Sequence, residues 1–298
     1  MIWIPDLSSR SMELIFSSIL RGFLELNPAS GLDIFADPIV KGSVEIYSKV
    51  TADFLPTPTK SHYTFNLRDL SKVVQGILQI KHEHLNDKDM LVQLWLHETF
   101  RVFRDRLVDV KDRDKFNDIT FSVMKKQLDV EWEKADYADV LFGDYDNGER
   151  DYMKLPPTKN LLNRLDDYLE AFNSENTGKM NLVFFDDAIS HMTRTARIVR
   201  SQRGNALLVG VGGSGRRSMA RLASFISNMS CYSIEITKNY REKEWHENIK
   251  DLLREVGVED KPKTFLFADT QIVYESFLED INNILNTGEV PNLFAADE

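Results

Sequence analysis

The sequence predicts two parts of different fold class, an all-helical bundle over residues 1–150 followed by an α/β domain over residues 151–298. Apolar residues recur at helical spacing through the first part, whereas in the second part short apolar runs alternate with helical segments. A stretch rich in turn-forming residues, 143–158, reads as the connector between them.

Helical periodicity dominates the first part of the chain. Apolar stripes with polar backs predict helices over 11–26, 57–78 and 87–107, and a further one over 160–173. Within 87–107 one apolar face has spacings of four, four, three and four, and we expect it to be core: Val92, Leu96, Phe100, Phe103 and Leu107. Residues 30–135 should then form a compact bundle.

Three short strand-like runs mark the second part, at 205–210, 232–237 and 264–269. Helical segments separate them, over 216–227 and 242–257. Strands that alternate with helices are typical of a parallel sheet, because each helix provides the crossover that parallel strands need. The sequence therefore predicts an α/β domain with a parallel sheet.

Composition excludes several classes of function. The 298 residues are 42% hydrophobic, which suits domains with real cores, and a formal net charge of −10 argues against nucleic acid or an anionic membrane as partner. The single cysteine, Cys231, allows no internal disulfide. The start, "MIWIPDLSSR", lacks a signal-peptide pattern, and no apolar run reaches the ~18 residues of a membrane helix. These features predict a soluble intracellular protein.

A glycine-rich stretch follows the first strand-like run and opens a helical segment. It matches the phosphate-binding pattern G-x-x-x-x-G-K-[ST] at both glycines, but Arg216 replaces the lysine and Arg217 replaces the hydroxyl residue that binds magnesium. Ser218 does not substitute, because one further helical residue turns its side chain ~100° away. The predicted phosphate-binding residues are Gly210, Val211, Gly212, Gly213, Ser214, Gly215, Arg216 and Arg217.

The strand-like run "TFLFADTQI" resembles the second half of a nucleotide-hydrolysing site. Such a strand ends in Asp, which holds magnesium, followed by Glu, which activates water. Asp269 is present, but Thr270 holds the Glu position and cannot act as a base, and Glu275 lies beyond the strand end. The sequence therefore predicts nucleotide binding without hydrolysis. Two alternatives stay open, an ATPase with an atypical base and a purely structural segment with an empty site.

Long phrases of the sequence resemble a dynein heavy chain. "GNALLVGVGGSGRRSMARLASF", "FLFADTQI" and "ESFLEDINNILNTGEVPNLF" are similar to its fourth AAA+ module. "LPTPTKSHYTFNLRDLSKVVQGIL" and "LWLHETFRVFRDRL" are similar to the helical lid of the third. The arginine in the lysine position and the missing Glu resemble axonemal rather than cytoplasmic chains, and the likeness runs in collinear order through nearly the whole chain.

This resemblance implies a fold and a setting. The fold is an incomplete AAA+ P-loop parallel-sheet domain preceded by an all-α AAA+ lid bundle, as a fragment of a motor that walks on microtubules in cilia. The implied cofactor is ADP or ATP, with or without Mg²⁺. The implied partners are neighbouring AAA+ modules of the same heavy chain, dynein intermediate and light chains, and microtubules. The implied location is the cytoplasm, the cytoskeleton and the axoneme of the cilium.

The resemblance also suggests roles for single residues. Asp269 would be the residual magnesium partner. Leu182, Val183 and Phe184 would form the wall that packs on adenine, with ordinary core packing as the alternative. Arg68, in "FNLRDL", matches the second-sensor arginine that serves the nucleotide of the preceding module, with a surface ion pair as the alternative.

The family's strand order, 5-1-4-3-2, gives one structural expectation. The three strand-like runs correspond to the first three strands, and the sequence stops before the fourth and fifth. The first strand would then lack both neighbours, which leaves its N–H and C=O groups unpaired. We expect it either to stay isolated, with Leu207 and Leu208 exposed, or to pair with the third strand.

Overall fold

The structure is a computed structural model that describes residues 7–132, 134–137, 140–146 and 148–295. The chain divides into two compact units after Pro157, called here the helical unit, Met1–Pro157, and the sheet unit, Thr158–Glu298. The predicted fold class, a helical bundle followed by a partial α/β domain, is confirmed. The first six residues, examined above for a targeting signal, and one residue of the 143–158 connector lie outside the described residues.

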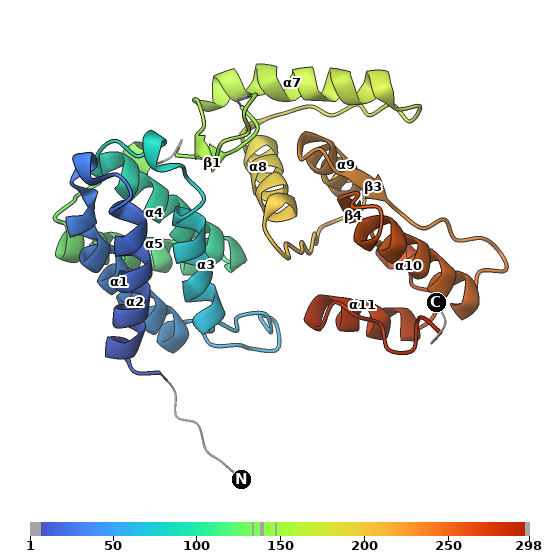
Figure 1. The fold of residues 1–298 in the computed structure, drawn as a ribbon, viewed down its shortest axis with the longest axis horizontal. Coiled ribbons are helices and arrows are strands. Elements are labelled where there is room, and N and C mark those ends of the chain that lie inside the picture. The colour runs from blue at the N-terminus through green and yellow to red at the C-terminus, as the bar shows by residue number, and fades with distance from the viewer. Residues whose placement is uncertain (1–6, 133, 138–139, 147, 296–298) are drawn as a thin grey trace, which may run out of the picture. The chain divides into compact units, whose positions relative to one another are not determined.

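Helices build nearly all of the helical unit (Figure 1). Its α-helices are α1 (Ser9–Leu24), α2 (Ala36–Asp53), α3 (Leu67–Ile77), α4 (Lys88–Val102), α5 (Val110–Leu128) and the short α6 (Lys134–Tyr137). Four 3₁₀ turns connect them, η1 (Pro28–Ser30), η2 (Leu32–Phe35), η3 (His82–His84) and η4 (Arg104–Arg106). Two short strands, β1 (Phe142–Gly143) and β2 (Met153–Lys154), pair antiparallel, and they lie at the start of the predicted connector and within it.

Side-chain caps fix where these helices begin. The Asn66 side chain accepts the backbone N–H of Arg68 at 2.9 Å, and the Asp69 carboxylate accepts that of Asn66 at 3.0 Å, which is a capping box at the start of α3. Asp87 caps α4 by accepting the N–H of Met90 at 2.7 Å. Because residues 57–66 contain Pro58 and precede this cap, the helix predicted over 57–78 is shorter, Leu67–Ile77.

The core of the helical unit surrounds α4. The indole N–H of Trp95 donates to Ser43 of α2 at 2.8 Å, and Trp95 is fully buried. Gly76 on α3 lies so close to the buried Glu98 carboxylate that a Cβ at Gly76 would overlap it. The core as a whole draws on α1 to α5, so the predicted compact bundle over 30–135 is confirmed and also includes α1.

The prediction of a helix over 87–107 was wrong about where the helix ends and correct about which residues are buried. It ends at Val102, and Phe103 and Leu107 flank the 3₁₀ turn η4. All five predicted face residues are nonetheless buried. Burial of α4 also extends well beyond that face, to Leu91, Leu94 and Trp95, because other helices cover it on several sides.

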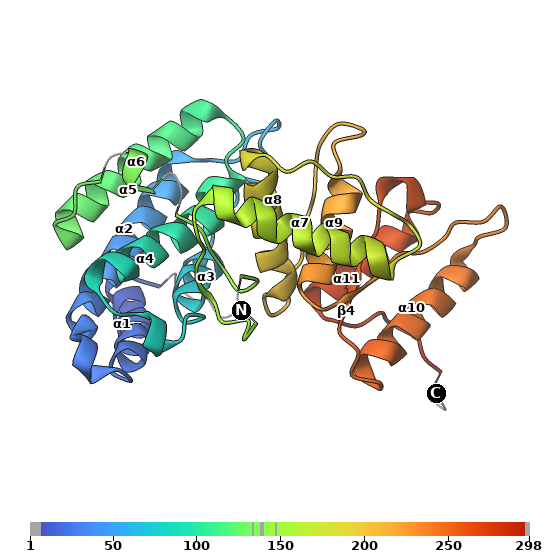
Figure 2. The ribbon, with the colours of Figure 1, turned by 90° about the horizontal axis from the view of Figure 1, so that it is seen from above.

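In the described residues, the sheet unit contains five α-helices and a two-stranded parallel sheet (Figures 1 and 2). Its elements are α7 (Thr158–Glu175), α8 (Asp186–Arg200), α9 (Arg216–Ile226), β3 (Ser230–Tyr232), α10 (Glu242–Gly257), β4 (Lys263–Phe265), the 3₁₀ turn η5 (Asp269–Gln271) and α11 (Ser276–Asn286). Helix α7 packs on α8 and α9. Strands β3 and β4 pair parallel, with α10 as the crossover between them.

The strand predictions were only partly correct. The β3–β4 ladder joins Ser230 to Lys263, and Tyr232 to Phe265, so it begins earlier and is shorter than predicted over 232–237 and 264–269. Within the described part of the chain, residues 205–210 form no strand at all. Leu207 is 89% exposed and Leu208 is half-buried, which matches the isolated outcome expected for this run rather than pairing with the third strand.

A second core fills the sheet unit around Trp245 of α10. The Trp245 ring stacks on Phe277 of α11, with ring centroids 4.3 Å apart, and its indole N–H donates to Asp280 at 2.8 Å. Phe265 and Phe267 contact the same indole from the end of β4. This packing joins α10 and α11 to β4 and so positions the residues that follow it. Over the residues that the structure describes, no helix is long and apolar enough to cross a membrane.

Candidate functional site

The glycine-rich residues 210–217, called here the phosphate loop, lead into helix α9. Gly213 and Gly215 have φ angles of +80° and +77°, a left-handed conformation that favours glycine. Gly215 occupies the position just before α9, and its carbonyl accepts the N–H of Met219 at 2.8 Å. The loop from Gly210 to Ser214 is exposed. Its backbone and the start of α9 therefore form the kind of open, electropositive turn that binds phosphate.

Arg216, in the lysine position of the pattern, folds back along the loop. Its guanidinium Nη2 donates to the carbonyl of Val211 at 3.2 Å. A Cβ at Gly210 would lie 3.5 Å from Arg216 Cδ and 3.3 Å from Ser214 Oγ, so the side chain runs close beside Gly210. This arrangement holds one positive charge against the loop itself.

Arg217 contacts the residue that replaces the catalytic Glu. Its Nη2 donates to the hydroxyl of Thr270 at 2.6 Å, and both side chains are exposed. Thr270 lies in η5, directly after β4, and its backbone N–H donates to Asp269 Oδ1 at 3.0 Å. The structure thus brings together Arg217, Thr270 and Asp269, whose positions the sequence identified separately as those of the hydroxyl, the base and the magnesium partner.

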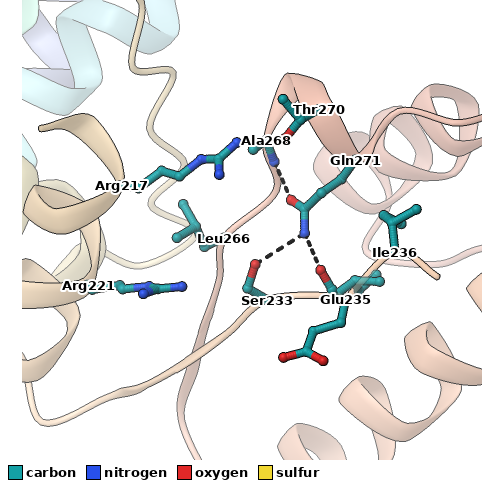
Figure 3. A pocket seen from close by; sticks show the side chains of 10 residues that line it. Arg217, Arg221, Ser233, Glu235, Ile236, Leu266, Ala268, Thr270 and Gln271 are labelled. Carbon is teal, nitrogen blue, oxygen red and sulfur yellow. Dashed lines mark hydrogen bonds between the residues drawn. The ribbon is translucent and has the colours of Figure 1, made fainter. Parts of the chain in front are cut away.

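Gln271 is a site residue that sequence reasoning missed. It is buried, and its side-chain amide N–H groups donate to Ser233 Oγ at 3.2 Å and to the carbonyl of Ile234 (Figure 3). Its amide oxygen accepts the N–H of Ala268 at 2.6 Å. These bonds tie η5 to the chain that follows β3, where the ladder has ended, and so they position Asp269 and Thr270. A polar residue two places after Asp269 was the only signal in the sequence.

A cavity of about 300 Å³ lies between α9 and the chain beyond the strand ends. Arg217 and Arg221, one helical turn apart on α9, both extend toward it, and Thr270 and Gln271 border it from η5 (Figure 3). Ser233, Ile234, Glu235, Ile236, Leu266 and Ala268 complete its lining.

The residues predicted to pack on adenine lie just before α8, and they differ in exposure. Leu182 is half-buried, and its Cδ2 lies 3.9 Å from where a Cβ on Gly215 would be, so it adjoins the phosphate loop. Phe184 is also half-buried. Val183 is 83% exposed and therefore is not core in this structure. Contact of these residues with adenine stays a prediction.

Arg68 belongs to the helical unit, at the first turn of α3. Its backbone N–H is the one that Asn66 caps, and its side chain is exposed. Among the described residues it forms no ion pair, so the alternative of a surface ion pair gains no support. Its role as a second sensor stays a prediction.

The residues around Asp269 do not fit a magnesium ion. Mg²⁺ requires oxygen ligands in a near-octahedral shell. The Thr270 hydroxyl accepts from Arg217, and Asp269 Oδ1 accepts from the backbone of Thr270. No cluster of three acidic, His or Cys side chains suited to a metal exists among the described residues. A guanidinium cation also occupies the position from which the usual hydroxyl ligand comes.

Comparison with known families defines the class of protein. A family profile described as "AAA+ lid domain" matches residues 39–142, and another, described as "P-loop containing dynein motor region D4", matches residues 180–298. The first falls on the helical bundle, and the second on the phosphate loop, the parallel sheet and α11. The chain therefore combines an AAA+ lid with a P-loop domain of the dynein type.

Similar proteins narrow the class to one family. The chain is 46% identical to dynein axonemal heavy chain 6 of Homo sapiens over 305 aligned residues, which cover 100% of the chain and 7% of that protein. It is 45% identical to dynein axonemal heavy chain 1 of Mus musculus, over 98% of the chain and 7% of the relative. It is 44% identical to the dynein-1-beta heavy chain of the flagellar inner arm I1 complex of Chlamydomonas reinhardtii, again over 98% and 7%. The chain belongs to the axonemal dynein heavy chains, and it spans about 7% of the length of these relatives.

Proposed function

We propose that the sheet unit is a nucleotide-binding module that holds ADP or ATP without hydrolysing it. The hydrogen bond between Arg217 and Thr270 is the observation that carries this proposal. It joins the residue that replaces the magnesium-binding hydroxyl to the residue that replaces the catalytic Glu, while the phosphate loop itself is kept. The phosphate loop supplies backbone N–H groups and the N-terminus of α9 for the phosphates. Leu182, next to Gly215, is a candidate for contact with the base.

Loss of hydrolysis follows from the groups at the end of β4. Attack of water on a phosphoryl group needs a residue that orients and deprotonates the water, and threonine cannot act as that base near neutral pH. The Thr270 hydroxyl is in addition engaged by Arg217. Bound nucleotide would therefore persist, and its binding energy would stabilise the folded module by mass action.

The wider setting is proposed from the relatives. Their names place them in the axoneme and in a flagellar inner arm complex, so we assign this chain to the axonemal cytoskeleton of cilia. In this setting the helical unit would end the third AAA+ module and the sheet unit would begin the fourth. A nucleotide that is not turned over would regulate or stabilise the ring. Neighbouring AAA+ modules, intermediate and light chains, and microtubules would be partners of the whole complex.

A single-turnover assay on the full heavy chain tests the proposal. With its other nucleotide sites disabled by mutation, we expect radiolabelled ATP to be retained at this site and no phosphate to be released above the background of a loop-deleted control. Clear phosphate release would support the ATPase with an atypical base. Absence of any bound nucleotide would support the structural segment with an empty site.

Restoring the base alone separates the loss of the catalytic base from the loss of the magnesium-binding hydroxyl. The variant Thr270→Glu should stay inactive, because Arg217 still denies magnesium a hydroxyl ligand. A double variant with Arg217→Ser and Thr270→Glu restores both groups and is the matched comparison. Turnover by Thr270→Glu alone would contradict the assigned role of Arg217.

A further inference from the structure

We propose that Arg217 takes the place of the divalent cation, so that this site binds a nucleoside di- or triphosphate without Mg²⁺. The inference rests on the proposed nucleotide binding. It adds that the positive charge that neutralises the phosphates comes from a protein side chain. It begins from the geometry at the start of α9, where the Arg217 guanidinium is hydrogen-bonded to Thr270 at 2.6 Å.

Position is the first step. A magnesium ion in a P-loop site is held between the hydroxyl residue at the end of the loop and the acidic residue at the end of a neighbouring strand. Arg217 occupies the first of these positions, and Asp269 occupies the second. The hydrogen bond from Arg217 to Thr270, the neighbour of Asp269, spans the space between them. The positive charge is thus part of the protein.

Donor capacity is the second step. A guanidinium has five N–H donors in a planar fork and no acceptor, and it suits two phosphate oxygens at once. The structure commits Nη2 of Arg217 to Thr270. Thr270 therefore orients the fork, and the remaining N–H groups of this exposed side chain are available to phosphate oxygens.

Exclusion of the metal is the third step. Arg217 would repel a divalent cation placed beside it, because like charges interact unfavourably at short range. The hydroxyl of Thr270 already accepts from the guanidinium, and Asp269 Oδ1 already accepts from the Thr270 N–H. Arg216 adds no ligand either, since it is a second cation folded against Val211. The two guanidinium groups therefore favour an anion at this point, and Asp269, bonded to the Thr270 N–H, is the acidic side chain beside them.

Photoaffinity labelling of the full heavy chain with azido-ADP tests the inference, with the crosslinks located by mass spectrometry in residues 180–226. The half-saturating concentration is measured in excess Mg²⁺ and in excess EDTA. We expect the two values to agree within about 3-fold, because the fixed guanidinium supplies the charge. A separate P-loop protein with Lys and Ser at these positions is labelled in parallel, and its labelling should be weaker in EDTA than in Mg²⁺.

Two different failures of this labelling can be told apart. Labelling of residues 180–226 that weakens about 10-fold or more in EDTA would overturn the metal-free proposal and leave nucleotide binding intact. No specific labelling in either condition would overturn both this proposal and the proposed function.

Substitutions assign the effect to Arg217. We expect Arg217→Ser to weaken labelling in EDTA by about 10-fold or more and to recover part of it in Mg²⁺, since a hydroxyl ligand replaces the charge. Arg241→Ser is the matched control, because Arg241 is an exposed arginine just before α10 that does not border the cavity; it should change labelling less than about 3-fold. Circular dichroism of both variants checks that they fold. Equal labelling of Arg217→Ser and the native chain in EDTA would overturn the proposal.

Discussion

The two units of this chain bury their tryptophans in the same way but differ in what they leave exposed. Trp95 in the helical unit and Trp245 in the sheet unit are both fully buried, and each indole N–H donates to a side chain at 2.8 Å. In the helical unit five helices contribute to the core around α4. The sheet unit exposes Leu207 by 89% and Val209 by 83%, just before the phosphate loop, whereas the most exposed large apolar residue described in the helical unit, Leu14, is 70% exposed.

This difference shows how a binding loop depends on its surroundings. The helical unit has the contacts of a scaffold, in which a local change is resisted by packing on several sides. In the sheet unit the phosphate loop is exposed, and among the described residues it is held by turns, by α9 and by the Arg217–Thr270 bond. Binding residues are often located on such loops, because mobility and access there cost little packing energy.

The largest effect is expected from Trp95→Ala. The substitution should destabilise the helical unit by about 3–5 kcal/mol, because it leaves a large cavity in a core that helices cover on several sides and removes the hydrogen bond to Ser43. Trp245→Ala should cost the sheet unit less, toward ~3 kcal/mol, since α11 can move toward the space. Urea unfolding followed by hydrogen exchange of peptides reads each unit separately. Equal losses of unfolding free energy from the two substitutions would contradict the proposed difference between the units.

Glycine substitutions should sharpen the same contrast at a smaller scale. Gly76→Ala in the helical unit should cost about 2–3 kcal/mol, because the added methyl group meets the buried Glu98 carboxylate. Gly213→Ala should cost the sheet unit about 1–2 kcal/mol, because its φ of +80° strains an L-residue although open space surrounds it. The free energy of unfolding of each unit is the quantity to measure.

Gly212 provides the control for the loop. A Cβ there would meet nothing within 4 Å, and the backbone is not left-handed, so Gly212→Ala should leave stability unchanged or slightly higher. If Gly212→Ala and Gly213→Ala cost the same, the loss at Gly213 would not come from its backbone conformation.

The smallest effect concerns pH and Glu45 of α2. Burial raises the pKa of Glu45, but hydrogen bonds from Lys126, Lys49 and Gln127 outweigh it and lower the pKa from 4.5 to about 2. A depressed folded-state pKa contributes stability above pH 4.5 that is lost as the pH falls toward 2. The native helical unit should therefore lose its stability advantage over Glu45→Gln between these pH values.

Glu259 in the sheet unit is the counterpart for this titration. A hydrogen bond from Lys261 lowers its pKa, but the pair is exposed. The effect of Glu259→Gln on stability should be the same at about pH 6 and about pH 3, two values on either side of an ordinary carboxylate pKa. Urea midpoints at both pH values measure the two variants. A larger loss for Glu259→Gln than for Glu45→Gln would reverse the comparison.

Much of this protein is determined by its sequence alone. The apolar spacing located α1, α4, α7, α9 and α10, and the glycine pattern located the phosphate loop with its two arginines. Residue identity also gave the missing base, because no environment makes Thr270 a carboxylate. These features depend on local conformation and chemistry, which neighbouring residues specify directly.

Tertiary structure decided the features that depend on residues far apart in the chain. Helix α4 is buried on several sides because neighbouring helices surround it, although its spacing predicts one face. The strand-like run at 205–210 stays unpaired, because a strand forms only where a neighbour supplies ladder bonds. Gln271 joins η5 to the chain beyond β3, and Arg217 meets Thr270 across 53 positions of sequence. The identities of both residues were visible in the sequence, but the hydrogen bond that gives their pairing a function exists only when α9 and the end of β4 are brought together.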